Sequence, residues 1–209
     1  MQSIFHPVPA PPAPALAGKT PQMLAWLKKI RARRQTARLL YGSIVTAARR
    51  HTFYADWGAP DTLQGRFELI LVHLVLAQRR LMLEGPGGAR LARALSEVFV
   101  VDMDDQMREM TFGDLRVPRE INGATAALFD RWRAYDGALA TGEGRPLAEA
   151  LAGQLAYLDP EARIDTRNLA GYMRRAAEAI LAQPSARILA GEFAWPSPQA
   201  PAVSEEPLS

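Results

Sequence analysis

The sequence of 209 residues predicts an all-α fold, a single helical domain of about six to eight helices with disordered, Pro-rich termini. Apolar residues recur three and four positions apart through most of the chain, which is the spacing of one helix face. No segment shows the apolar–polar alternation that is typical of a strand. Apolar residues make up 48% of the chain, enough for a hydrophobic core.

The amino-terminal part is expected to consist of a leader and a basic helix. Residues 1–22 contain six prolines and are predicted to be extended or disordered. Residues 23–35 predict a basic amphipathic helix that can lie on an anionic membrane surface or pack on its own domain. Met23 is typical of a natural protein start, which gives the hypothesis that translation begins there. The candidate residues for membrane or partner contact are Lys28, Lys29, Arg31, Arg33, Arg34 and Arg38.

A helical domain is expected over residues 36–190. Its first helix covers about residues 36–50, and an aromatic loop follows at residues 51–60. Asp61 or Thr62 can cap the next helix, which is apolar on nearly all faces up to Leu83. A helix of this kind is expected at the centre of the core.

Four further helices are predicted by apolar stripes, at about residues 91–105, 119–140, 146–157 and 163–182. The glycines and proline of residues 84–88 separate the central helix from the first of them, and Gly113 and Pro118 follow that helix. Residues 195–209 are rich in Pro and Ser and are expected to form a disordered tail.

The net charge of +3 is unevenly distributed along the chain. Nine cations precede the first acidic residue, Asp56, and this basic block fits anionic lipid, RNA or an acidic protein surface. A solvated helix face is the alternative interpretation. The longest apolar run, residues 67–83, is interrupted by charged residues and does not predict a membrane span.

The chain offers few groups for catalysis. Cysteine is absent, which excludes disulfides, thiolate metal sites and a cysteine nucleophile. No metalloprotease, calcium-loop or catalytic-triad motif is present, so the sequence predicts no catalytic residue, no metal and no cofactor. His73 lies in the apolar central helix, where a hydrogen-bonded core histidine is favoured over a ligand.

An acidic cluster is the strongest candidate for a polar site. It contains Asp102, Asp104, Asp105, Glu109 and Asp114. The arginines expected near it are Arg66, Arg79, Arg80 and Arg108. An internal network of acids and arginines is favoured over a calcium site, which needs about six to eight oxygen ligands. Replacing Arg66 or Asp104 is therefore expected to lower stability, and an enzyme that uses the cluster with His73 is an alternative.

Three blocks of residues follow one another in an order that is typical of one protein family. The first block includes Tyr41, Asp61, Gly65, Arg66, Glu68 and His73. The second includes Asp102, Asp104, Asp105, Arg108, Gly113 and Asp114. The third includes Arg131 and Tyr135. Over about residues 39–139 the sequence thus resembles the ubiquinol–cytochrome c chaperone family, and its Arg-rich composition is typical of a bacterial member.

The resemblance has limits within the chain. Thr111 and Phe112 stand where the family has Gly and Val, and Asp130 stands where it has glycine. The helices after Gly144 lie beyond the resemblance.

The resemblance implies an assembly chaperone for the cytochrome bc complex, without catalysis, that binds nascent or unassembled cytochrome b. Other partners that it implies are a small partner chaperone, the ribosome and an anionic membrane surface, but not DNA. The expected location is cytoplasmic, peripherally associated with the inner membrane. A peripheral membrane protein that binds lipid or quinone is the alternative.

Overall fold

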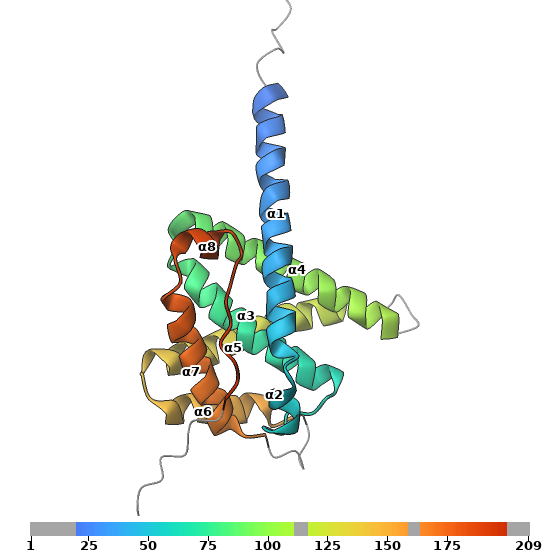
Figure 1. Ribbon diagram of the computed structural model, residues 1–209. Helices are drawn as coiled ribbons and strands as arrows, with labels where there is room; N and C mark the ends of the chain where they lie inside the picture. Colours follow the sequence, from blue (N-terminus) through green and yellow to red (C-terminus); the bar gives the residue numbers. More distant parts are fainter. Residues whose placement is uncertain (1–19, 111–116, 159–163, 200–209) are drawn as a thin grey trace, which may run out of the picture. The chain divides into compact units, whose positions relative to one another are not determined.

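The computed structural model describes residues 20–110, 117–158 and 164–199, and the chain divides into two units, Met1–Ala32 and Arg33–Ser209. Within the described ranges the chain forms eight helices and no strand, which confirms the all-α prediction (Figure 1). The helices are α1 (Thr20–Ala48), α2 (His51–Ala55), α3 (Leu63–Met82), α4 (Gly85–Met110), α5 (Val117–Ala140), α6 (Gly144–Leu155), α7 (Thr166–Leu181) and α8 (Ser185–Leu189).

The first helix is longer than predicted. One continuous helix, α1, replaces the two that were expected at residues 23–35 and 36–50. Residues 22–41 contain neither proline nor glycine, so nothing in this stretch interrupts the backbone hydrogen bonds. Residues 20–22, which were assigned to the leader, belong to the first turn of α1, and residues 1–19 lie outside the described ranges.

The core of the second unit is built around α3, as its apolar composition predicts. Every residue from 68 to 77 is buried, and α4, α5 and α7 all pack on this helix. Each apolar side chain buried in this way contributes about 1.5–3 kcal/mol to the free energy of unfolding. None of the described helices is long and apolar enough to span a bilayer.

The structure confirms the predicted cap at the start of α3 and differs from the predicted turn after it. Thr62, not Asp61, caps α3, because its side chain accepts a hydrogen bond from the Gly65 amide at 3.2 Å. The expected turn at residues 84–88 is mostly helical, since α4 begins at Gly85, whose φ of +64° reverses the chain after α3. A Cβ atom on Gly88 would lie 2.0 Å from the carbonyl oxygen of Leu81, so glycine allows the two helices to meet closely.

Two segments have more structure than the sequence predicts. A short helix, α2, occupies part of the expected aromatic loop, and its Phe53 is buried. The carboxy-terminal segment continues past the short helix α8 and packs on the domain. Arg50 donates hydrogen bonds to the carbonyl oxygens of Trp195 and Pro196, Pro198 is buried, and Arg175 donates to the carbonyl oxygen of Gln199. The predicted disorder from residue 195 therefore does not hold for residues 195–199, and residues 200–209 lie outside the described ranges.

Candidate functional site

His73 is fully buried on α3, and both of its ring nitrogens have partners. Nδ1 lies 2.7 Å from the carbonyl oxygen of Leu69, and because a carbonyl only accepts, Nδ1 carries the proton. Nε2 then accepts a hydrogen bond from the Tyr172 hydroxyl on α7 at 2.7 Å. Burial lowers the pKa of His73 to about 4, so the ring is neutral near pH 7. This is the hydrogen-bonded core histidine that the sequence favours.

Aromatic rings enclose His73 on several sides. The ring of Phe53 lies 5.7 Å from the His73 ring and 5.0 Å from the Tyr172 ring, measured between centroids. Trp195 covers another side at 4.9 Å, and its Nε1 donates a hydrogen bond to Ser43 on α1 at 3.2 Å. The histidine thus joins α2, α3, α7 and the carboxy-terminal segment in one packed cluster, with no access for a substrate.

A second buried polar contact joins α3, α5 and the turn after α6. The Glu68 side chain is 1% exposed, and Arg131 donates to both of its carboxylate oxygens, from Nε at 3.1 Å and from Nη2. Tyr157 donates a third hydrogen bond to Glu68 at 2.8 Å. A buried carboxylate needs this kind of paired, multiply hydrogen-bonded environment. The sequence singles out Glu68 without predicting which cation it meets.

Tyr135 is the remaining motif residue of this region. Its side chain is fully buried on α5, and its hydroxyl has no hydrogen-bond partner among the described groups. Burial and the charge of Glu68 raise the pKa of Tyr135, so it stays neutral. Its contribution is therefore chiefly the packing of a large ring in the core.

The motif residues at the start of α3 shape a tight corner. A Cβ atom on Gly65 would lie 2.0 Å from the carbonyl oxygen of Pro60, so this position requires glycine. Arg66 pairs with Asp61 at 2.7 Å and lowers the pKa of that carboxyl group. Both side chains are about half exposed, so solvent screens the pair and its contribution to stability is small.

Three of the four arginines expected near the acidic cluster pair with carboxylates outside it. The Tyr41 hydroxyl on α1 donates to Asp102 Oδ2 on α4 at 2.7 Å. Three of the expected arginines pair elsewhere, in the pairs Arg66–Asp61, Arg79–Asp136 and Arg80–Glu84. The predicted contacts of Arg66, Arg79 and Arg80 with the cluster are therefore replaced by these pairs, and the predicted pair of Arg108 with Asp104 stays a prediction. In the described parts of the chain no three potential metal ligands gather. The side chain of Arg108, with Gly113 and Asp114, lies outside the described residues.

Basic and acidic candidates meet in a pocket of about 480 Å³ between α1 and α4. Its lining includes Arg34, Arg38, Tyr41, Asp102 and Asp105. Two candidates for partner contact thus lie beside three motif residues, although they are far apart in the sequence. Arg34, Arg38 and Asp105 are exposed, so a partner can reach charges of both signs here.

The amino-terminal unit carries the other exposed basic candidates, Lys28, Lys29 and Arg31. On the same stretch of α1, four apolar side chains are 49–59% exposed: Met23, Leu24, Trp26 and Leu27. Exposed apolar and basic side chains on one short helical segment are typical of a membrane-surface helix. Arg33 belongs to the second unit and is partly exposed.

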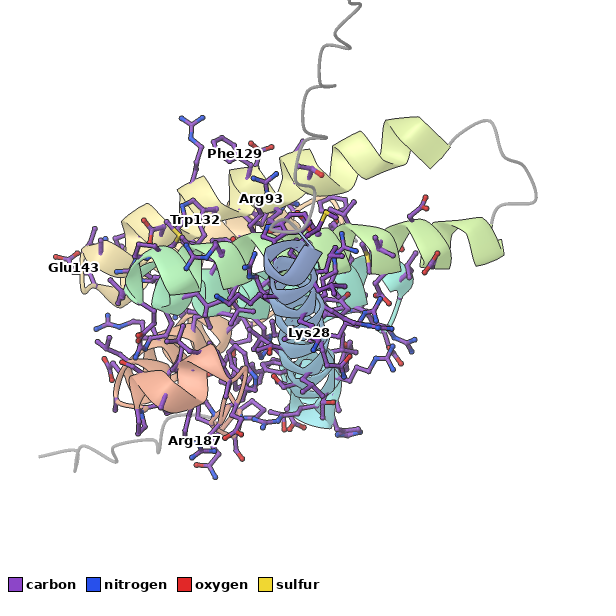
Figure 2. The ribbon with its side chains drawn as sticks, turned by 90° about the horizontal axis from the view of Figure 1, so that it is seen from above. Lys28, Arg93, Phe129, Trp132, Glu143 and Arg187 are labelled. Atoms are coloured by element: carbon purple, nitrogen blue, oxygen red, sulfur yellow. The ribbon has the colours of Figure 1, made fainter. Side chains whose placement is uncertain are left out.

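An apolar groove between α3, α4 and α5 is a surface that the sequence did not predict. It has a volume of about 450 Å³ and is lined by Met82, Ala92, Leu128, Phe129 and Trp132, among others. Phe129 is 60% exposed and Met82 is 55% exposed. Figure 2 shows Phe129 and Trp132 of α5 near Arg93 of α4. Periodicity places Trp132 on a buried stripe, but it cannot show that the neighbouring helices leave part of that stripe open.

The comparisons with known proteins identify the family. The sequence profile described as ubiquinol-cytochrome C chaperone matches residues 55–195, more than half of the chain. The chain belongs to the ubiquinol–cytochrome c chaperone family. A solved structure, the crystal structure of the Cbp3 homologue from Brucella abortus, has 28% sequence identity and a TM-score of 0.73. The alignment covers 84% of this chain and 97% of that one. No curated protein matches the sequence.

The family match and the resemblance noted from the sequence cover different ranges. The match begins at residue 55 and continues to residue 195, so it includes the helices after Gly144, which lie beyond the resemblance, and it leaves out residues 39–54. The match includes both buried polar contacts, those of Glu68 and of His73, and it ends at the Trp195 that covers His73. This family member is a chaperone of ubiquinol–cytochrome c reductase assembly, and its buried polar groups hold its helices together.

Proposed function

We propose that this chaperone binds nascent or unassembled cytochrome b at the cytoplasmic surface of the inner membrane, before cytochrome b enters the cytochrome bc complex. The observation that carries the proposal is the family match over residues 55–195. The similarity to the Cbp3 homologue over 84% of this chain supports it. The proposed action is non-catalytic because the family it belongs to is described as a chaperone, and the His73 imidazole is hydrogen-bonded within an aromatic cluster.

The amino-terminal stretch of α1 supplies the membrane contact. Trp26 and Leu27 are about half exposed and can enter the interface between headgroups and acyl chains. Lys28, Lys29 and Arg31 lie next to them and attract anionic headgroups, at about 1 kcal/mol for each cation near the surface. These two contributions act together, since apolar insertion holds the cations close to the lipid.

The apolar groove between α3, α4 and α5 supplies the contact with the client. An unassembled membrane protein presents apolar helices, and such a helix fits a groove with aromatic anchors. Phe129 and Trp132 provide these anchors, and Ala92 leaves room for a close approach. Arg93, whose side chain is 85% exposed, and Arg133, which lies 5.9 Å from the Phe129 ring centroid, place positive charge at the rim.

A deletion strain tests the proposal. Loss of the gene is expected to lower cytochrome b and reductase content, and the wild-type gene should restore both. The Phe129→Ser variant should restore the reductase at least about fivefold less well, because it removes an exposed aromatic anchor without opening a cavity in the core. Leu39→Ser is the matched control, since Leu39 is also 60% exposed but lies on α1 outside the groove. A normal reductase content in the deletion strain would reject the chaperone function for this client.

A peripheral protein that binds lipid or quinone remains a second candidate, favoured by the exposed apolar side chains of Met23 and Leu24. Co-sedimentation of the pure chain with anionic vesicles separates the two functions when it is combined with the deletion strain. Vesicle binding with a normal reductase content supports the lipid-binding protein. Vesicle binding with a reduced reductase content supports the chaperone. A small partner chaperone and the ribosome are further partners under this proposal.

A further inference from the structure

α6 and α7 pack against each other (Figure 1), and a groove of about 840 Å³ with a strongly basic lining lies between them. Its arginines are Arg145 on α6 and Arg167, Arg174 and Arg175 on α7. Among the described residues none of these guanidinium groups forms an ion pair with a carboxylate. The carboxylates that also line the groove are those of Glu149 and Glu178. The excess of positive charge favours an anionic ligand.

Two of the arginines place their guanidinium groups against small residues of the groove. Arg174 reaches across to the start of α6, where a Cβ atom on Gly144 would lie 3.9 Å from its Nη1. Arg175 lies back along α7, and a Cβ atom on Gly171 would lie 3.3 Å from its Nη1. Arg175 also donates from Nη2 to the carbonyl oxygen of Gln199 at 2.6 Å, and its guanidinium group has further N–H donors. Planar guanidinium groups bind a phosphate group in a bidentate manner.

An apolar rim adjoins the basic groove. Arg174 and Glu178 also line a second pocket, of about 200 Å³, whose walls include Leu83, Leu139 and Leu181. Leu83 is 66% exposed and Leu181 is 59% exposed. Exposed leucines beside arginines are typical of a protein surface that inserts apolar side chains among acyl chains while its cations meet the headgroups.

Nucleic acid is the other phosphate-bearing polymer that arginines bind. Proteins that bind single-stranded nucleic acid stack its bases on aromatic side chains. The described residues that line the two pockets include no aromatic side chain, and leucines stand at the rim instead. The lining therefore favours a phospholipid over a nucleic acid.

We propose that the α6–α7 groove binds the phosphate groups of anionic phospholipids, while Leu83 and Leu181 enter the adjoining layer of acyl chains. This is a second lipid contact, formed entirely by the second unit and separate from the basic stretch of α1. It deepens the proposed function and rests on the proposed location at the surface of the inner membrane. The deletion strain measures reductase content and not lipid binding, so it reports the proposed function independently of this groove.

Co-sedimentation of the full chain with vesicles tests this proposal. Vesicles of phosphatidylcholine with phosphatidylglycerol are compared with vesicles of phosphatidylcholine alone, at low salt. The Arg145→Gln/Arg174→Gln variant should bind the anionic vesicles at least about fivefold less tightly than the wild type, because two cations that face the headgroups are lost. The control, Arg90→Gln/Arg187→Gln, removes the same charge from exposed arginines outside the groove. It should change binding less than about twofold.

Leu181→Ser is an independent variant, which should weaken binding to the anionic vesicles at least about threefold because less apolar surface enters the membrane. Leu39→Ser is its matched control, since Leu39 is 60% exposed on α1 and lies outside both pockets. The groove variants should have the same effect after Lys28, Lys29 and Arg31 have been replaced by Gln, because the two lipid contacts are separate. Circular dichroism melts of all variants check that the fold is unchanged.

Several outcomes overturn the proposal. One is a loss of vesicle binding no larger with Arg145→Gln/Arg174→Gln than with Arg90→Gln/Arg187→Gln, and another is equal binding of Leu181→Ser and the wild type. Inorganic phosphate and a labelled single-stranded RNA are the probes for other ligands. If the groove variant abolishes only a rise of Tm with phosphate, the groove binds a free anion. If it lowers only the fluorescence anisotropy of the RNA, the groove is a nucleic-acid site.

Discussion

At the residue scale, the neutral His73 makes the stability of the fold sensitive to acid. Its pKa is about 4 in the folded protein and 6.5 when unperturbed, so between these values the unfolded chain takes up a proton and the folded chain does not. The contribution of the neutral His73 to the free energy of unfolding is therefore fully present above pH 6.5 and is lost as the pH falls toward 4. At pH 4.5 the loss from this residue is about 2.5 kcal/mol.

Urea unfolding at pH 7.5 and pH 4.5 measures this effect. The His73→Gln variant is expected to lose about 2.5 kcal/mol less than the wild type between the two pH values, because every other titrating group is shared. The exposed His51 provides the control, and His51→Gln should lose as much as the wild type. The same acid-induced loss in the His73→Gln variant would contradict the assigned neutral form, which rests on contacts with Leu69 and Tyr172.

Also at the residue scale, the contact of Glu68 with Arg131 is expected to be costly to break. Arg131→Ala leaves a carboxylate that is 1% exposed without its counter-charge, and unfolding should require about 3–5 kcal/mol less. Replacing both residues, Glu68→Leu with Arg131→Met, should recover most of this loss. Denaturant unfolding measures all variants.

Arg66→Ala is the control for this experiment. Its pair with Asp61 is exposed and screened by solvent, so its loss should lower the free energy of unfolding much less than Arg131→Ala does. This corrects the expectation from the sequence that replacing Arg66 removes a buried pair. An equal decrease in the free energy of unfolding for Arg66→Ala and Arg131→Ala would contradict the difference in burial between the two ion pairs.

At the element scale, the junction of α3 and α4 offers a test of close packing. Gly88→Ala places a methyl group where the Leu81 carbonyl oxygen lies 2.0 Å away, so the start of α4 must shift. The expected cost is about 2 kcal/mol or more. The neighbouring Gly87→Ala meets only the side chain of Leu189 at 3.9 Å and should be neutral or stabilising. Thermal melting compares the two variants, and equal Tm values would contradict the geometry of this junction.

Also at the element scale, the positions of the helices could be predicted from the sequence, whereas the contacts between distant segments could not. Apolar periodicity is a local property, so α3, α5 and α7 lie within a few residues of their predicted ranges. The packing of Trp195 depends on Ser43, which lies 152 residues away, and composition alone favours disorder there. The partners of Glu68, which are Arg131 on α5 and Tyr157 after α6, likewise follow from how the helices cross, which no local pattern contains.

At the scale of the whole molecule, the two units present different side chains, and we propose different tasks for them. The amino-terminal unit presents Trp26 and Leu27 beside cations, whereas the second unit contains the family's helical domain and its grooves. Lys28→Gln, Lys29→Gln and Arg31→Gln together should weaken binding to anionic vesicles by about 3 kcal/mol at low salt. The fold should be unaffected, because these side chains are exposed. Co-sedimentation and a thermal melt of the same protein check both statements, and undiminished vesicle binding would exclude this helix as the membrane contact.

The proposed binding of cytochrome b is tested most directly by a pull-down. Tagged wild-type chain and the Phe129→Ser variant are purified from solubilised membranes of the host, and mass spectrometry identifies the proteins bound to each. The expected result is enrichment of cytochrome b with the wild type and a clear reduction with the variant, since Phe129 is the most exposed anchor of the apolar groove. Absence of cytochrome b from the wild-type sample would contradict binding of this client.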